Sequence, residues 1–310
     1  MRRAIPWVLL SLLGLVTVAT AALGAAGSPT TPGATPSQWV AGVLATTARA
    51  GSAHLIYAHV TASPNPDLRG TTSGQGVVDF SRGSVRVTQV DHEVEFEAGP
   101  TGPARAVPSV TDEEGIILGS VMYARISPAA LGTHVTEADF PFMKESVPRQ
   151  PRAELGLSFA FDAPAGLGDL AGIEPVVDVR DLGSATLDGR ATTEYLVETA
   201  PLQPCPPVRK TAIVTTEGAN RVWVDGHGRL VQVRTSSHFS GHLPAAVRKL
   251  PSFARFPVGP ITTTDTLTFS AFGAPVHIAA PPPSTLSPQE HASTGYSSSV
   301  RIKNSSCPSS

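Results

Sequence analysis

One serine has neighbours that approach those of a catalytic nucleophile. Ser158 lies in Gly156-Leu157-Ser158-Phe159-Ala160, close to the pattern in which two glycines permit a strained strand-to-helix turn that exposes a serine for acyl transfer. Here Ala160 replaces the second glycine. Histidines and aspartates occur elsewhere, but without known proximity to Ser158 they define no triad. We therefore interpret Ser158 as an ordinary strand serine and keep hydrolysis as a minor alternative.

The stretch Gly166–Ala171 loosely matches the glycine pattern of dinucleotide-binding turns. Such a turn needs a strand that ends directly at the first glycine, so that a helix N-terminus meets the pyrophosphate. Residues 162–165 separate the stretch from the preceding apolar run, and no repeating strand-helix pattern surrounds it. The stretch is better explained as the start of a helix, and we expect no cofactor.

His238 and His242 have the spacing of two metal ligands on one helix face. The residues between them, Phe239-Ser240-Gly241, lack the glutamate of the zinc-protease pattern and include a helix-breaking glycine. A loop is therefore expected there, with neither a metal nor a catalytic centre. Several carboxylates are candidate acids or bases by residue type alone, although exposed turn positions explain them better: Asp79, Asp91, Asp112, Glu113 and Glu114.

The first 26 residues have the three-part layout of a secretory signal. Met1-Arg2-Arg3 is positive, residues 7–26 carry no charge, and small residues close the run. If it is not cut, the run from residue 5 to 26 is also long enough to cross a hydrocarbon core about 30 Å thick. The linker at 27–36, rich in Gly, Ser, Pro and Thr, favours cleavage. Either outcome places the rest of the chain outside the cytoplasm, secreted or in the cell envelope.

Composition favours a turn-rich β protein of one domain. Glycine and proline supply 57 of 310 residues, and charged residues only 15%. Without Arg2 and Arg3, 21 basic residues face 25 acidic ones, a net charge of −4. Proteins that bind nucleic acid place a basic patch against the phosphates. This chain is net acidic, so we expect no nucleic-acid binding.

Periodicity predicts one clear helix and then a series of strands. Apolar residues at helical spacing follow Pro36-Ser37 as far as Arg49. The alternation of apolar and polar residues that is typical of strands begins at His54. It fades between 127 and 171, where short helices and loops are expected, and then resumes. The best hairpin pattern runs from Val222 to Val231. The predicted strands are 55–60, 76–80, 84–90, 93–98, 116–125, 174–182, 191–199, 212–216, 220–225, 230–236, 264–272 and 275–279.

Cys205 and Cys307 are the only cysteines. An oxidising compartment allows them to pair, and exposed free thiols are unusual there. We predict an intramolecular disulfide that ties the Ser/Pro-rich tail, 284–310, to the turn at 204–207. That tail is otherwise expected to be flexible.

Three blocks resemble the LppX/LprG group of actinobacterial envelope proteins. The first is 178–195, and the second is a tryptophan-aspartate hairpin, Asn220–Asp225 with Gly228–Val231. The third, Thr266–Val276 with Pro281, resembles the closing strand of the family, and 164–171 resembles its mid-domain short helix. The blocks follow the family's order and cover most of 37–283. The lipobox cysteine of the lipoprotein members is missing, which leaves the mode of membrane attachment open.

The resemblance implies the fold of LolA and LolB. In that mainly β (α+β) fold a strongly curved antiparallel sheet forms a half-barrel, with helices across its concave face. The resemblance also implies non-enzymatic transport of an acylated lipid or lipoglycan in a hydrophobic cavity. Related sensor domains of RseB type bind envelope signals, so an envelope sensor or protein-interaction module of the same fold is the alternative. An uncleaved leader would favour the sensor.

The concave face of a half-barrel must be filled by helices or by an apolar ligand, since its own strands cannot fill it. Alternation in 76–80 places Val78 and Phe80 on one face and Asp79 on the wetter one, so we expect the first face to be concave. Core packing explains inward apolar residues as well as ligand contact does. The candidate cavity-wall residues are Val78, Phe80, Val87, Phe96, Leu118, Tyr123, Trp223 and Phe269.

Overall fold

The structure is a computed structural model, and it describes residues 33–64, 69–97, 105–128, 141–146, 176–199, 213–241 and 260–287. Several features discussed above lie outside these residues. They are the leader, most of the linker, Ser158, the glycine pattern at 166–171, His242, both cysteines and the tail beyond 287. The disulfide and the leader therefore stay predictions. No helix in the described ranges is long and apolar enough to cross a membrane.

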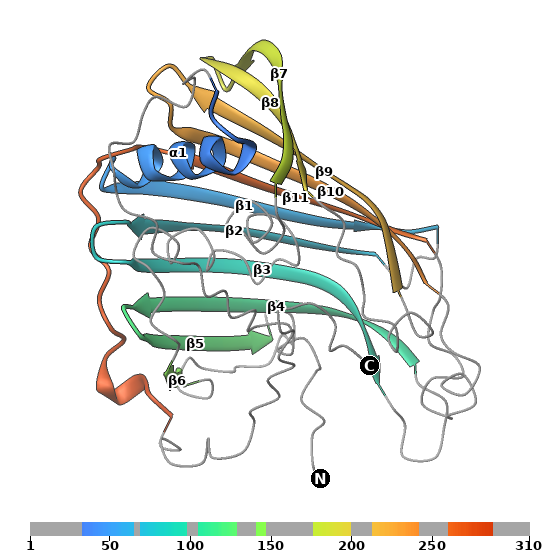
Figure 1. Cartoon of the computed structure of the whole chain (residues 1–310). Helices are drawn as coiled ribbons and strands as arrows, with labels where there is room; N and C mark the ends of the chain where they lie inside the picture. Colours follow the sequence, from blue (N-terminus) through green and yellow to red (C-terminus); the bar gives the residue numbers. More distant parts are fainter. Residues whose placement is uncertain are drawn as a thin grey trace, which may run out of the picture.

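In the described ranges, eleven strands form a single curved antiparallel sheet (Figure 1), which confirms the predicted mainly β fold class. Strands that follow one another in sequence are neighbours, except that β6 and β7 form the two edges of the sheet, and β1 in the middle pairs with both β2 and the last strand, β11. The order is β6-β5-β4-β3-β2-β1-β11-β10-β9-β8-β7. The strands are β1 (Ser52–Ala62), β2 (Gly70–Asp79), β3 (Ser84–Glu97), β4 (Arg105–Leu118), β5 (Val121–Pro128), β6 (Met143–Ser146), β7 (Val176–Leu187), β8 (Arg190–Thr199), β9 (Ile213–Asp225), β10 (Leu230–Gly241) and β11 (Ile261–Ser270).

Five predictions about the strands need correction. The segment 116–125 is two strands, because Gly119 has a φ of +64° that suits a tight turn. The predicted pairs 84–90 with 93–98, and 212–216 with 220–225, are the single strands β3 and β9. Residues 275–279 form no strand. The expected loops between 127 and 171 contain the short edge strand β6.

The one helix of the described chain, α1 (Pro36–Ala48), confirms the predicted N-terminal helix. Its cap is Thr35, whose side chain accepts a hydrogen bond from the Gln38 N–H while Gln38 Oε1 accepts from the Thr35 N–H. Trp39 and Val43 are buried, and the main contacts of α1 are with β7 and β10. α1 therefore lies on one face of the sheet, which we call the helix face (Figure 1).

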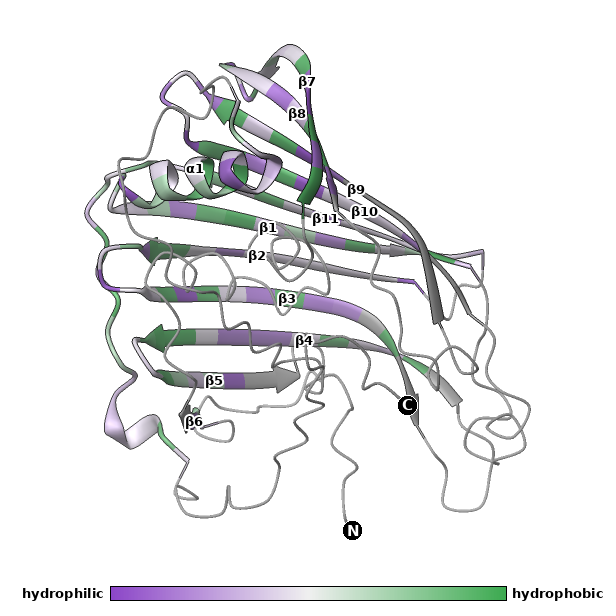
Figure 2. Ribbon diagram, viewed as in Figure 1, coloured by the Kyte–Doolittle hydropathy of each residue, from purple (hydrophilic) through white to green (hydrophobic). Residues whose placement is uncertain are grey.

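Cross-strand register shows that the helix face is apolar at one end of the strands. Two rows of mutually opposite residues, which we call the apolar rows, define this end. Figure 2 shows the corresponding green ends of β3, β4 and β5, and the purple middle of β3 and β4. One row is Ala53, Val78, Val85 and Ile117, and the other is Phe269, Leu55, Gly76, Val87, Gly115 and Ala124.

Gly74 and Gly76 allow the close approach of β2 and β3. A Cβ on Gly76 would lie 2.3 Å from the backbone oxygen of Arg86, and a Cβ on Gly74 would lie 2.9 Å from that of Thr88. Real Cβ atoms do not approach backbone so closely, so only glycine fits. Glycine at such sites marks a bend or close approach within a sheet, and these two positions contribute to its curvature.

The chain after β11 forms backbone hydrogen bonds with residues at one end of the sheet. The Gly273 N–H donates to the Ser52 carbonyl oxygen at 2.9 Å, and Phe142 and Leu286 then form a parallel bridge next to β6. Figure 1 shows this orange-red segment following the strand ends from β11 to the short 3-10 turn Pro283–Thr285. It links the central strands to one edge of the sheet.

Candidate functional site

Four of the eight predicted wall residues lie together on the helix face. Val78 and Phe269 are fully buried, while Phe80 is 3% and Val87 8% exposed. The rings of Phe80 and Phe269 have centroids 6.4 Å apart. All four belong to one core cluster that also includes Trp39 of α1. Val78 and Phe80 thus share a buried face, as predicted, and their contact with a ligand stays a prediction.

The other four lie at positions of the opposite face. Leu118 pairs with Ser84, Tyr123 with Ile116, and Trp223 with Gln232, and none of these positions belongs to the rows of the helix face. Phe96 pairs with Ala106 at a strand position that also belongs to the opposite face. The structure does not describe the side chain of Phe96. The eight positions therefore do not share one face, because side chains alternate strictly between faces and register decides which face each one joins. Contact of any of the eight residues with a ligand stays a prediction.

Beyond the apolar rows, the helix face becomes polar. One row of mutually opposite residues, which we call the polar row, crosses seven neighbouring strands from β9 to β4. The row is most deeply buried at β9, β10 and β11, where residues are 1 to 3% exposed, and is more open towards β4. Its members are Asn220, Thr235, Asp265, His59, Thr72, Asp91 and Thr111.

Asp265 is the hub of a chain of hydrogen bonds. Its Oδ1 accepts from the Tyr57 hydroxyl at 3.0 Å and lies 2.7 Å from His59 Nδ1. The other ring nitrogen, Nε2, lies 2.8 Å from the Thr61 hydroxyl oxygen. Asp265 is 3% and the His59 side chain 14% exposed. The carboxylate thus fixes the orientation of the imidazole, which in turn holds Thr61.

Within the part of the chain that the structure describes, three buried polar atoms next to this chain of hydrogen bonds have no hydrogen-bond partner. They are Asp265 Oδ2, Asn220 Nδ2 and Thr263 Oγ1. The Asn220 side-chain oxygen is satisfied, since it accepts from the Thr235 hydroxyl at 2.6 Å. Thr263 is two residues from Asp265 on the same face of β11 and lies opposite Thr61. All three unpaired atoms therefore point from the same end of the helix face.

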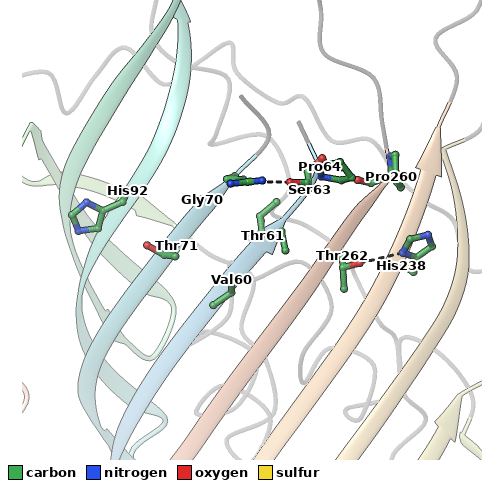
Figure 3. Close-up of a pocket in the computed structure, with 12 residues that line it drawn as sticks. Val60, Thr61, Ser63, Pro64, Gly70, Thr71, His92, His238, Pro260 and Thr262 are labelled. Carbon is green, nitrogen blue, oxygen red and sulfur yellow. Dashed lines mark hydrogen bonds between the residues drawn. The ribbon is translucent and has the colours of Figure 1, made fainter. Parts of the chain in front are cut away.

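An open depression of about 720 Å³ lies at the adjacent ends of the central strands. Figure 3 shows Thr61 and Ser63 on its wall, with Thr262 within 3.2 Å of His238 Nδ1. Arg69 donates from Nε to the Ser63 carbonyl oxygen at 2.8 Å. Five lining residues, Val60, Thr71, His92, His238 and Thr262, occupy strand positions of the face opposite the helix face. The depression therefore does not continue the polar end of the helix face, although Thr61 belongs both to its wall and to the Asp265 chain. The lining contains no carboxylate: Val60, Thr61, Ala62, Ser63, Pro64, Arg69, Gly70, Thr71, His92, His238, Pro260 and Thr262.

The order carboxylate, imidazole, hydroxyl also occurs in sites that activate a nucleophile. Here the hydroxyl belongs to Thr61, in a regular strand paired on both sides, with Thr263 and with Gly70. Ladder pairing occupies backbone N–H groups that an oxyanion hole would need. The arrangement is therefore better suited to binding than to acyl transfer. Within the described ranges, no group of three His, Cys, Asp or Glu residues could hold a metal ion.

Sequence reasoning overlooked the polar row, although one signal pointed to it. In β11 the buried positions alternate as Thr263, Asp265, Leu267 and Phe269. A charged residue in phase with core residues is costly to bury unless it is paired. Asp265 therefore stood out as an inward carboxylate, but its partners Tyr57 and His59 lie about 200 residues earlier and only the register reveals them.

No protein-family model matches the chain, and no curated protein matches it. Among solved structures, it is similar to a domain assigned to outer membrane lipoprotein sorting from Vibrio parahaemolyticus, at 8% identity over 74% of this chain and 91% of that one, with a TM-score of 0.21. It is also similar to a DUF1329 family protein from Desulfovibrio piger ATCC 29098, at 9% identity over 77% and 92%, with a TM-score of 0.19. At such TM-scores neither structure is informative about the function of this chain.

Proposed function

We propose that this protein is an extracytoplasmic, non-enzymatic carrier that binds an acylated lipid or lipoglycan on the helix face of its sheet. The observation that carries the proposal is the amphipathic helix face, which is apolar along one end of the strands and polar along the other. An amphiphile has the same division, with an acyl chain at one end and a polar head at the other.

The apolar rows extend well beyond the strands that α1 mainly contacts. They extend from β11 to β5, six neighbouring strands, or roughly 24 Å at the usual strand spacing. A helix is about 10 Å wide, and the contacts of α1 are mainly with β7 and β10. The helix alone therefore cannot cover the apolar rows. Seven of their members are already buried, whereas Gly76, Gly115 and Ala124 are partly exposed, and each CH₂ of an acyl chain buried over these three positions would contribute about 0.8 kcal/mol.

Small residues occupy part of the helix face away from α1. Gly76, Gly115 and Ala124 lie in one apolar row, and Gly74 lies one pair of residues further along β2. Side chains rise from a sheet and fill the space above it, so positions with at most one methyl group leave volume there. In this proposal the acyl chain extends beyond the helix and takes up the space above these small residues of β2, β4 and β5.

The test is mass spectrometry of organic extracts of the protein purified from its native host. We expect one class of acylated lipid in a stoichiometric amount. A second preparation, stripped of lipid and incubated with vesicles of the host's total lipid, should reacquire the same class. If neither preparation contains lipid, the proposed function is wrong.

A further inference from the structure

We infer that the polar row binds hydroxyl groups of the ligand's head, which makes the ligand an amphiphile with an uncharged, polyhydroxylated head. This inference rests on the proposed function for the acyl chain, but the head site has its own observations. They are the three unpaired atoms Asp265 Oδ2, Asn220 Nδ2 and Thr263 Oγ1.

These atoms need a partner. The residues are 3%, 1% and 7% exposed, in the order Asp265, Asn220, Thr263, so bulk water does not solvate them. A buried polar group without a partner destabilises the folded protein, and such groups in native proteins call for an explanation. Three of them on one face, on β9 and β11, indicate a site that a ligand completes.

The chemistry of the three atoms selects the ligand group. Asp265 Oδ2 can only accept a hydrogen bond when ionised, Asn220 Nδ2 can only donate, and the Thr263 hydroxyl can do both. An ammonium group would satisfy Asp265 but offers nothing to Asn220. A phosphate or carboxylate would satisfy Asn220 but is repelled by Asp265. Hydroxyl groups donate and accept, so they match all three.

Spacing requires more than one hydroxyl. Asn220 and Asp265 are two strands apart, roughly 10 Å, whereas Thr263 and Asp265 are two residues apart on one strand, roughly 7 Å. Several hydroxyls on one scaffold, as in a sugar or another polyol, reach such separated partners. The neighbouring pair Leu267 and Tyr57 lies between the polar row and the apolar rows, so a head bound here continues directly into a tail on the apolar rows.

The experiment compares octyl ligands that share a tail and differ in the head. Octyl β-glucoside, octyl sulfate and octyltrimethylammonium each displace a fluorescent fatty-acid probe from the lipid-stripped, full-length protein, below their micelle concentrations. We expect the glucoside to bind at least about tenfold more tightly than the two charged ligands, which corresponds to one or two hydrogen bonds. Methyl β-glucoside, a head without a tail, should bind far more weakly.

Thr263→Val is the decisive variant because it removes one unpaired hydroxyl without changing shape. The stability of the unliganded protein should be unchanged or higher, since a buried group without a partner disappears. Affinity for octyl β-glucoside should fall about fivefold, the effect of one hydrogen bond, with the charged ligands unaffected. Thr266→Val, on the opposite face of the same strand, is the matched control and should change nothing. Asp265→Asn, nearly isosteric, should also abolish the preference for the glucoside.

The outcomes separate this inference from the proposed function. If the three octyl ligands bind equally and neither Thr263→Val nor Asp265→Asn changes that, the polar row holds water only and the head site is wrong, although the acyl site stands. If methyl β-glucoside binds as tightly as the octyl form, the site takes a free sugar and the amphiphile is wrong. If the fatty-acid probe itself does not bind, the proposed function fails first.

Discussion

Thr47 of α1 accepts a hydrogen bond from the backbone N–H of Leu230 at 2.8 Å, which ties the helix to the first residue of β10. Both residues are buried, and the Thr47 hydroxyl donates its own proton to the Val43 carbonyl oxygen. Thr47→Val leaves the Leu230 N–H without an acceptor. We predict a loss of about 1 to 3 kcal/mol in the free energy of unfolding, measured with urea.

Thr46→Val is the control for this prediction. Its hydroxyl bonds within α1 only, to the Gly42 carbonyl oxygen and to Arg49, so we expect a change within about 0.5 kcal/mol. Equal losses in the two variants would show that the link between α1 and β10 contributes little.

The Asp225 carboxylate in the β9–β10 turn makes the free energy of unfolding depend on pH in the acidic range. Burial opposes ionisation of Asp225, but hydrogen bonds from the Arg229 side chain and from the backbone N–H groups of Arg229 and His227 outweigh it, so the pKa of Asp225 is lowered. The unfolded state therefore binds this proton more readily. The resulting stabilisation is fully present above the unfolded pKa of about 3.9 and is lost as the pH falls through the lower folded value.

Asp225→Asn should thus cost about 1 to 3 kcal/mol at neutral pH, and this difference from the wild type should shrink towards pH 3. Urea unfolding at both pH values measures it. Asp188→Asn removes an exposed carboxylate from another hairpin turn and, as the control, should leave the free energy of unfolding at neutral pH nearly unchanged. A difference between the wild type and Asp225→Asn that stays constant from pH 7 to pH 3 would contradict the assignment.

Local sequence patterns predicted the helix and the strands better than they predicted how the strands pair. The spacing of Trp39, Val40 and Val43 was sufficient to find α1, and alternation found most strands. What sequence could not supply was register. Within β3, the helix-face positions begin with Val85 and Val87 and continue with Gln89 and Asp91, so the apolar side changes along one strand. The period of two does not say which face is buried, since only the pairing with β2 and β4 decides it.

The curvature at β2 provides a third prediction. Gly76→Ala would place a Cβ 2.3 Å from the Arg86 backbone oxygen, and backbone cannot yield cheaply. We predict a loss of about 1 to 3 kcal/mol, the usual cost of overpacking, measured by thermal or urea unfolding. Gly226→Ala, in a turn where nothing lies within 4 Å of the added methyl, is the control and should be nearly neutral. A neutral Gly76→Ala would mean that β2 and β3 approach less closely.

The last prediction concerns the proposed acyl site, and its outcome depends on which residue is substituted. Val78 is fully buried in the core cluster, so a tryptophan there would overpack the core whether or not a lipid binds. Ala124 is half-buried, lies on the helix face of β5 and faces Gly115. Ala124→Trp should fill the volume that the proposal assigns to the acyl chain. We expect it to remove most co-purifying lipid while the melting temperature of the stripped protein falls little, because an unfilled space accepts volume without strain.

Ala58→Trp is the matched control, because Ala58 is also half-buried but lies on the opposite face of β1. It should retain the lipid of the wild type. Bound lipid, by mass spectrometry, and melting temperature are measured on both variants from the same host. Full lipid retention by Ala124→Trp, with a clear loss of stability, would mean that the space above Gly115 is core rather than ligand site, and the acyl chain could not lie there.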